Sequence, residues 1–207
     1  MAGHVSAPPW VLGYDPGKHG GAATLLDSEL KARAVWAWRS RTRGGETCFQ
    51  VAALQAEGGW TPSLAMRPTL GAVGDLVARQ AAAITGASRW RVWCEASHLH
   101  GGIRSPATAI RMGQITGALV GPVERYADGR RVPQVQAAEW RHKLLGLPIR
   151  TPRDRAKAAS LALVPNRIPG IGDALRALAD AYNASTDTLD HVTDSAGVAE
   201  YAARFGG

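Results

Sequence analysis

The stretch Leu12-Gly13-Tyr14-Asp15-Pro16-Gly17 decides the fold class, because it leads from an apolar strand pattern directly into a carboxylate and a turn. The apolar run 10–14 predicts a short buried strand. The Pro-Gly pair that follows, together with Gly20-Gly21, predicts a tight turn. Residues 22–26 then predict a second strand, which completes a hairpin. Asp15 is therefore expected at the end of the first strand of a sheet.

Apolar and charged residues alternate between Leu30 and Arg39, which predicts a third strand. The runs 90–94 and 132–135 predict a fourth and a fifth strand. Helices are expected between and after these strands, over residues 70–84, 105–120, 137–145, 153–163 and 188–205. This order predicts an α/β fold with a central mixed five-stranded sheet flanked by helices.

The length of 207 residues fits one large domain, expected over residues 10–207. Residues 1–9 contain a Pro-Pro pair and are expected to form a flexible lead-in. Two segments are expected to be irregular: residues 40–68, which are rich in Gly, Arg and Pro, and residues 164–186, which contain two prolines.

The chain is basic, with 24 Lys and Arg against 17 Asp and Glu and a net charge of +7. This balance favours a polyanionic partner such as nucleic acid. The two cysteines, Cys48 and Cys94, form no disulfide framework, so they are expected to be reduced thiols in the cytoplasm. No stretch of about 18 apolar residues exists, so no membrane span is expected.

Three acidic positions or groups, in a fixed order along this basic chain, are candidates for a shared site. The first is Asp15. The second is Glu95, which ends the apolar run 91–95, where an unpaired buried carboxylate would cost several kcal/mol. The third is the group Asp187, Asp190, His191 and Asp194. A turn aspartate remains an alternative for Asp15, and a buried ion pair with arginine remains one for Glu95.

The third group lies on the last expected helix. His191 and Asp194 are three residues apart and share a helix face, and Asp190 lies near it. Asp187 stands where a helix N-cap is expected. The small residues 195–199 would let the helix approach the sheet closely and bring Asp194 to the strand ends.

Together the carboxylates predict a metal site. Oxygen ligands suit Mg²⁺ or Mn²⁺, and two such ions can activate water and stabilise the leaving oxygen of a phosphodiester. The expected ligands are Asp15, Glu95, Asp194 and either His191 or Asp190, with two Mg²⁺ that Mn²⁺ can replace.

Residues 125–157 hold nine Lys and Arg against three Asp and Glu. Phosphate binding near a helix N-terminus is physically natural, although charge runs are often solvated faces. The loop 98–104 follows Glu95 directly and could contact DNA beside the metals. The candidate DNA-binding residues are Arg104, Arg141, Lys143, Arg153, Arg155 and Lys157.

These motifs resemble the RuvC family of Holliday-junction resolvases, within the ribonuclease-H-like superfamily. The similarity covers most of residues 10–27 and 90–204. It rests on the first strand end at 12–17, on Glu95, on the helix 105–121, on the basic segments 139–143 and 157–160, and on the final motif 191–196. In that motif an acid or His precedes an Asp by three residues, and small residues follow.

The resemblance implies a ribonuclease-H-like fold, a homodimer, two Mg²⁺ and paired incisions across a four-way junction, in a cytoplasmic enzyme associated with the nucleoid or encoded by a phage. By position it implies that Asp15, Glu95, His191 and Asp194 act in catalysis. It places Arg141 and Lys157 near the scissile phosphate, with Lys157 as a further catalytic candidate.

The chain departs from the family in one informative place. After Glu95 come Ala96-Ser97-His98-Leu99, without the aromatic residue that the family often uses as a junction wedge. A broader specificity for branched DNA would fit this difference. Two alternatives are a non-catalytic branched-DNA-binding protein and an actin-like nucleotide-binding protein, although the latter class needs two such domains.

Overall fold

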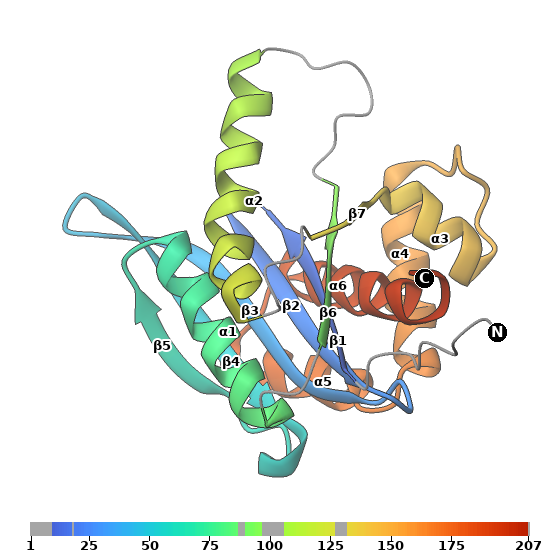
Figure 1. Ribbon diagram of the computed structural model, residues 1–207, viewed down its shortest axis with the longest axis horizontal. Helices are drawn as coiled ribbons and strands as arrows, with labels where there is room; N and C mark the ends of the chain where they lie inside the picture. Colours follow the sequence, from blue (N-terminus) through green and yellow to red (C-terminus); the bar gives the residue numbers. More distant parts are fainter. Residues whose placement is uncertain (1–9, 18, 87–89, 97–105, 127–131, 207) are drawn as a thin grey trace, which may run out of the picture.

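The computed structural model describes residues 10–17, 19–86, 90–96, 106–126 and 132–206. In these residues a mixed seven-stranded sheet is flanked by helices, in an α/β architecture (Figure 1). The strand order is β5-β4-β3-β2-β1-β6-β7. The strands are β1 (Trp10–Pro16), β2 (Gly20–Asp27), β3 (Ala32–Arg43), β4 (Glu46–Gln55), β5 (Ser63–Arg67), β6 (Trp90–Glu95) and β7 (Gln134–Val135).

Strands β1 to β5 form a continuous antiparallel meander, and β6 and β7 extend it on the other side of β1 as parallel strands. The register of β1 with β6 places Tyr14 opposite Cys94. Parallel strands end at the same edge of a sheet, so the residues that follow, Asp15 and Glu95, lie side by side at that edge. This confirms the expected placement of both carboxylates at strand ends.

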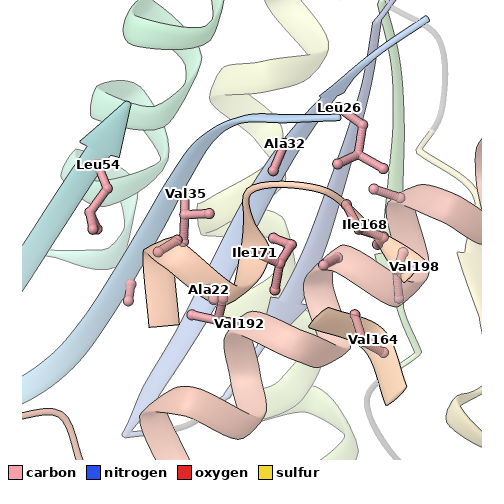
Figure 2. Close-up of a cluster of buried hydrophobic side chains, with 14 of the residues drawn as sticks. Ala22, Leu26, Ala32, Val35, Leu54, Val164, Ile168, Ile171, Val192 and Val198 are labelled. Atoms are coloured by element: carbon pink, nitrogen blue, oxygen red, sulfur yellow. The ribbon is translucent and has the colours of Figure 1, made fainter. Parts of the chain in front are cut away.

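Helices cover both faces of the sheet (Figure 1). Helices α1 and α2 pack on one face around Leu12, Trp36 and Val77. Helices α3 to α6 pack on the other, where Val35, Ile168 and Val198 belong to one buried cluster (Figure 2). The helices are α1 (Leu70–Thr85), α2 (Pro106–Tyr126), α3 (Ala137–Leu145), α4 (Arg153–Arg167), α5 (Ile171–Tyr182) and α6 (Thr186–Phe205), with a 3₁₀ turn at Ala56–Gly58.

Helix α6 lies unusually close to β1, as the small residues 195–199 predicted. A Cβ atom on Gly13 would stand 2.2 Å from the Ser195 carbonyl oxygen and 2.6 Å from the Ala199 nitrogen. The hydroxyl groups of Thr24 and Ser195 are 2.7 Å apart and hydrogen-bond in the buried interface. Helix α6 is therefore fixed against the strand that ends in Asp15.

The expectation of five strands was wrong, because the segment 40–68 is not irregular. It contains the end of β3, all of β4 and β5, and a tight turn at Gly44-Gly45, where both residues have positive φ. Two consecutive positive φ angles match the twist of a two-residue hairpin turn. The Gly44-Gly45 pair itself was the available signal, because two glycines between two runs are typical of a two-residue hairpin turn.

The segment 164–186 is also ordered, contrary to expectation. Helix α4 continues through Pro165 to Arg167, and α5 follows from Ile171. Pro165 lies in the last turn of α4, so the backbone hydrogen bond that its missing N–H cannot make is lost at the end of the helix and not in its middle. Ile168 and Ile171 are fully buried against the sheet, and this burial stabilises the short connection between the helices.

Some expectations fall outside the described residues: the flexible lead-in 1–9 and the candidate DNA contact Arg104. Cys48 and Cys94 are both free thiols. Among the described residues, no helix combines the length and apolar character that a bilayer crossing requires.

Candidate metal and nucleic-acid site

A cavity of about 490 Å³ opens at the edge of the sheet where β1 and β6 end. Its lining comes from distant parts of the chain: the β1–β2 turn, the end of β6, and helices α2, α3, α4 and α6. Three of the expected carboxylates line the cavity together with His191: Asp15, Glu95 and Asp194. The three acidic positions that the sequence analysis singled out therefore meet in one cavity.

Asp15 is paired with the first residue of the final motif. Nδ1 of His191 lies 2.5 Å from Oδ2 of Asp15. Gly17 makes this approach possible, because a Cβ there would stand 2.9 Å from Cε1 of His191. Burial lowers the pKa of His191, but the adjacent carboxylates of Asp15 and Asp194 outweigh it, so the net pKa is raised.

Glu95 is buried and held in place by one indole. Nε1 of Trp140 donates to Oε2 of Glu95 over 2.9 Å. The Trp140 ring in turn packs on Gly197 of α6, where a Cβ would stand only 2.4 Å from the ring. Trp140 is fully buried, so the position of the Glu95 carboxylate depends on the close packing of α3 on α6.

Asp194 is buried and paired with Arg141. Nη2 of Arg141 donates to Oδ2 of Asp194 over 2.7 Å, and its Nε donates to the hydroxyl of Ser160. Among the described residues, the second carboxylate oxygen, Oδ1 of Asp194, is buried and has no hydrogen-bond partner. A buried carboxylate oxygen normally has a hydrogen-bond partner. Because this one has none, its lone pairs are available to a bound ligand.

Asp190 is paired with Lys157. Nζ of Lys157 lies 2.8 Å from Oδ2 of Asp190. Oδ1 of Asp190 is buried and has no hydrogen-bond partner in the part of the chain that the structure describes. Asp187 is exposed, with its carboxylate 3.9 Å from the same amine. Lys157 lines the cavity, but Asp190 does not. Among the candidates for a fourth ligand, His191 is therefore better placed than Asp190.

The electrostatics of the cavity favour a bound cation. Burial raises the pKa of Glu95, and the neighbouring carboxylates of Asp15 and Asp194 raise it further. Burial also raises the pKa of Asp194 to about 6, against the opposing effect of Arg141. These shifts mean that close negative charges repel one another in a site that water does not solvate well. A divalent cation would relieve that repulsion.

The donor set fits Mg²⁺ or Mn²⁺, which prefer carboxylate oxygens. Asp15, Glu95 and Asp194 would provide them, and the unpartnered Oδ1 of Asp194 is free to bind. In the described part of the chain, however, no three acidic, histidine or cysteine side chains are already arranged as a metal-binding group. One oxygen of each carboxylate is engaged, by His191, Trp140 and Arg141 respectively, so metal binding would require small side-chain movements.

The basic candidates separate into two groups. Arg141, Arg153 and Lys157 line the cavity, although Arg141 is buried against Asp194. Lys143 instead lies over the rings of Tyr201 and Phe205, at the opposite end of α6. Arg155 is exposed on α4 and does not line the cavity.

Sequence reasoning missed three residues of the site. Arg39 lines the cavity from β3 and stacks on Tyr182 with its guanidinium 4.2 Å from the ring centre. Trp140 was assigned only to a basic segment, and Gly197 only to a run of small residues. The pairing of Trp140 with Glu95 joins residues 45 positions apart, so no local pattern could have indicated it.

Comparison of the chain with protein-family models, with curated proteins and with solved structures found no match. The functional argument therefore depends on the site itself.

Proposed function

We propose that this protein is a metal-dependent endodeoxyribonuclease that cuts four-way junctions or related branched DNA, as the RuvC family does. One observation carries the proposal: the carboxylates of Asp15, Glu95 and Asp194 meet in a single cavity of a chain with net charge +7. Buried acids are costly unless they are paired or bind metal. A basic protein that gathers them at a strand edge fits phosphodiester hydrolysis.

The topology supports the same proposal at the level of fold. Strands β3, β2 and β1 are antiparallel, and β6 and β7 continue the sheet in parallel. This is the arrangement expected for a ribonuclease-H-like core, to which β4 and β5 add an extra edge. Because one fold supports many chemistries, the site carries more weight than the fold.

In the proposed reaction, water attacks phosphorus, the bond to the 3′-oxygen breaks, and a 5′-phosphate and a 3′-hydroxyl result. Two divalent ions, when bound, would supply positive charge to the attacking and leaving oxygens. Asp15, Glu95 and Asp194 would hold these ions. His191, hydrogen-bonded to Asp15, would bind metal or orient the water. Lys157 and Arg153 would contact the phosphate at the cavity rim.

The pairing of Arg141 with Asp194 and of Lys157 with Asp190 favours a second candidate, a branched-DNA-binding protein without catalysis. Internal counterions can stabilise buried acids without any metal. The two candidates differ in metal binding and in cleavage, and both predict junction binding. A homodimer is proposed with the first candidate, since paired incisions need two sites.

The test uses a labelled synthetic four-way junction with Mg²⁺, Mn²⁺ or EDTA, beside linear duplex and an RNA–DNA hybrid. Metal-dependent, symmetrically paired nicks in the junction are expected, and Asp15→Asn should lower the cleavage rate by at least about 100-fold because it removes a metal ligand. Asp173→Asn is the matched control, since Asp173 is exposed on α5 and pairs with Arg176 of the same helix, away from the cavity lining. Full activity of Asp15→Asn would refute the metal-site assignment.

A further inference from the structure

The hairpin formed by β3 and β4 extends beyond the cavity. Arg39, the last residue of β3 to pair with β2, lies opposite Gly20 and lines the cavity. Beyond it, residues 40–43 pair with 46–49 of β4, and residues 41–47 are exposed. Figure 1 shows this light-blue hairpin reaching past the neighbouring strand ends. At about 3.3 Å per residue, Arg43 lies about 13 Å along the strand from Arg39.

Three arginines line one face of this hairpin. Arg39, Arg41 and Arg43 are spaced two residues apart, so they point to the same side of the strand. Arg39 contacts Tyr182 at the end of α5, which identifies that side as the α5 and α6 face. This is also the face on which α6 presents His191 and Asp194. The arginine row therefore continues outward from the cavity.

In the part of the chain that the structure describes, the positive charge of the two outer arginines is only partly balanced, since Glu46 lies opposite Arg43 in the strand register. Within the described residues, neither Arg41 nor Arg43 forms an ion pair; Arg41 donates only to Gln50, and Glu46 is the acid at the hairpin tip. The opposite end of the same strand differs. There Arg33 pairs with Asp27 and Glu57, and Lys31 pairs with Glu29.

We propose that Arg41 and Arg43 bind the phosphate backbone of one duplex arm while the branch point lies at the acidic cavity. This inference rests on the proposed function. Alternate strand residues are about 7 Å apart. This is close to the through-space separation of neighbouring phosphates on one DNA strand, because each step adds movement around the helix to the axial rise of about 3.4 Å. Exposed guanidinium groups suit phosphate oxygens. Such contacts position the DNA and do not read its sequence.

The experiment measures binding of a fluorescently labelled four-way junction in EDTA, so that no cleavage occurs, over a series of salt concentrations. Arg41→Gln combined with Arg43→Gln should weaken binding by about tenfold at low salt and reduce the salt slope by about 1.8, for two lost phosphate contacts. Lys31→Gln combined with Arg33→Gln removes the same charge from the other end of β3 and should leave the slope unchanged. In a separate assay with Mg²⁺, turnover at saturating DNA should be unchanged in the Lys31 and Arg33 variant.

Each outcome decides the question. An unchanged salt slope in the Arg41 and Arg43 variant, with the wild type binding the junction, would overturn the hairpin proposal and leave the proposed function standing. An equal loss in both double variants would overturn it too, since net charge alone would then explain the effect. Failure of the wild type to bind DNA at any salt concentration would overturn the proposed function as well. The double variant Arg41→Lys with Arg43→Lys keeps both charges and should retain most of the binding. Thermal melts of all variants verify that they fold.

Discussion

Substitution of Gly197 by alanine tests the idea that the packing of α3 on α6 positions Glu95. The added Cβ would stand 2.4 Å from Trp140, whereas carbon atoms prefer separations of about 3.5–4.0 Å. Relief of this overlap requires a displacement of about 1 Å or more. Nε1 of Trp140 is only 2.9 Å from Glu95, so a displacement of that size would break their hydrogen bond.

The expected loss of stability follows from these contacts. Overpacking of a core costs about 1–3 kcal/mol, and loss of a hydrogen bond to a charged group costs about 1.5–3 kcal/mol. The gain in helix propensity from Gly to Ala returns about 1 kcal/mol. The net destabilisation is about 3 kcal/mol, which corresponds to a fall in Tm of roughly 6–12 °C for a chain of this size.

The assay is thermal unfolding monitored by circular dichroism, with metal-dependent junction cleavage measured well below Tm. The matched control is Gly117→Ala, a glycine of α2 whose Cβ would meet open space. It should raise stability by about 0.5–1 kcal/mol and leave cleavage unchanged. A Gly197→Ala protein as stable as the wild type would refute the packing argument. A loss of stability in Gly117→Ala together with normal stability in Gly197→Ala would refute the packing argument too.

Two further predictions concern buried carboxylates. Burial raises the pKa of Asp194 from 3.8 to about 6; a raised carboxyl pKa favours folding at low pH, and this contribution is lost as pH rises through about 6. The free energy of unfolding of Asp194→Asn relative to wild type should therefore rise by about 2 kcal/mol from pH 4 to pH 8 in metal-free buffer. Urea unfolding at the two pH values measures this difference, and a difference that does not change with pH would contradict the prediction. Arg167 pairs with Glu200, which is 1% exposed. Arg167→Met should destabilise the fold by about 2–3 kcal/mol, because among the described residues the Glu200 carboxylate would keep one cationic partner, Arg204. Glu200→Gln in the same background should recover part of that loss, and no recovery would argue against an uncompensated charge.

The main strands and helices were predictable because their signals are local. Trp10–Tyr14 and Trp90–Cys94 are short apolar runs, and their polar ends place Asp15 and Glu95 correctly. The segment 40–68 was not predicted, because its arginines and glycines resemble a loop. Strand β4 is defined by its pairing with β3, which brings Phe49 and Val51 into the core, and β5 is defined by its pairing with β4.

The site shows the same division. The spacing of His191 and Asp194 on one helix placed both on the face that meets the sheet. The sequence did not indicate that Arg141 would be buried as the counterion of Asp194, nor that Lys143 would lie at the far end of α6. Both lie on one short helix, α3, and only its packing orientation separates their surroundings.

By itself, the sequence determined which carboxylates end strands and that the chain is basic, because strand periodicity and charge are properties of neighbouring residues. Tertiary structure decided which groups meet. The contact of Gly13 with α6, the stacking of Trp140 on Gly197 and the pairing of Asp15 with His191 join residues far apart in the chain. Such contacts depend on how closely the backbones pack, and that distance is set by the whole core rather than by any local pattern.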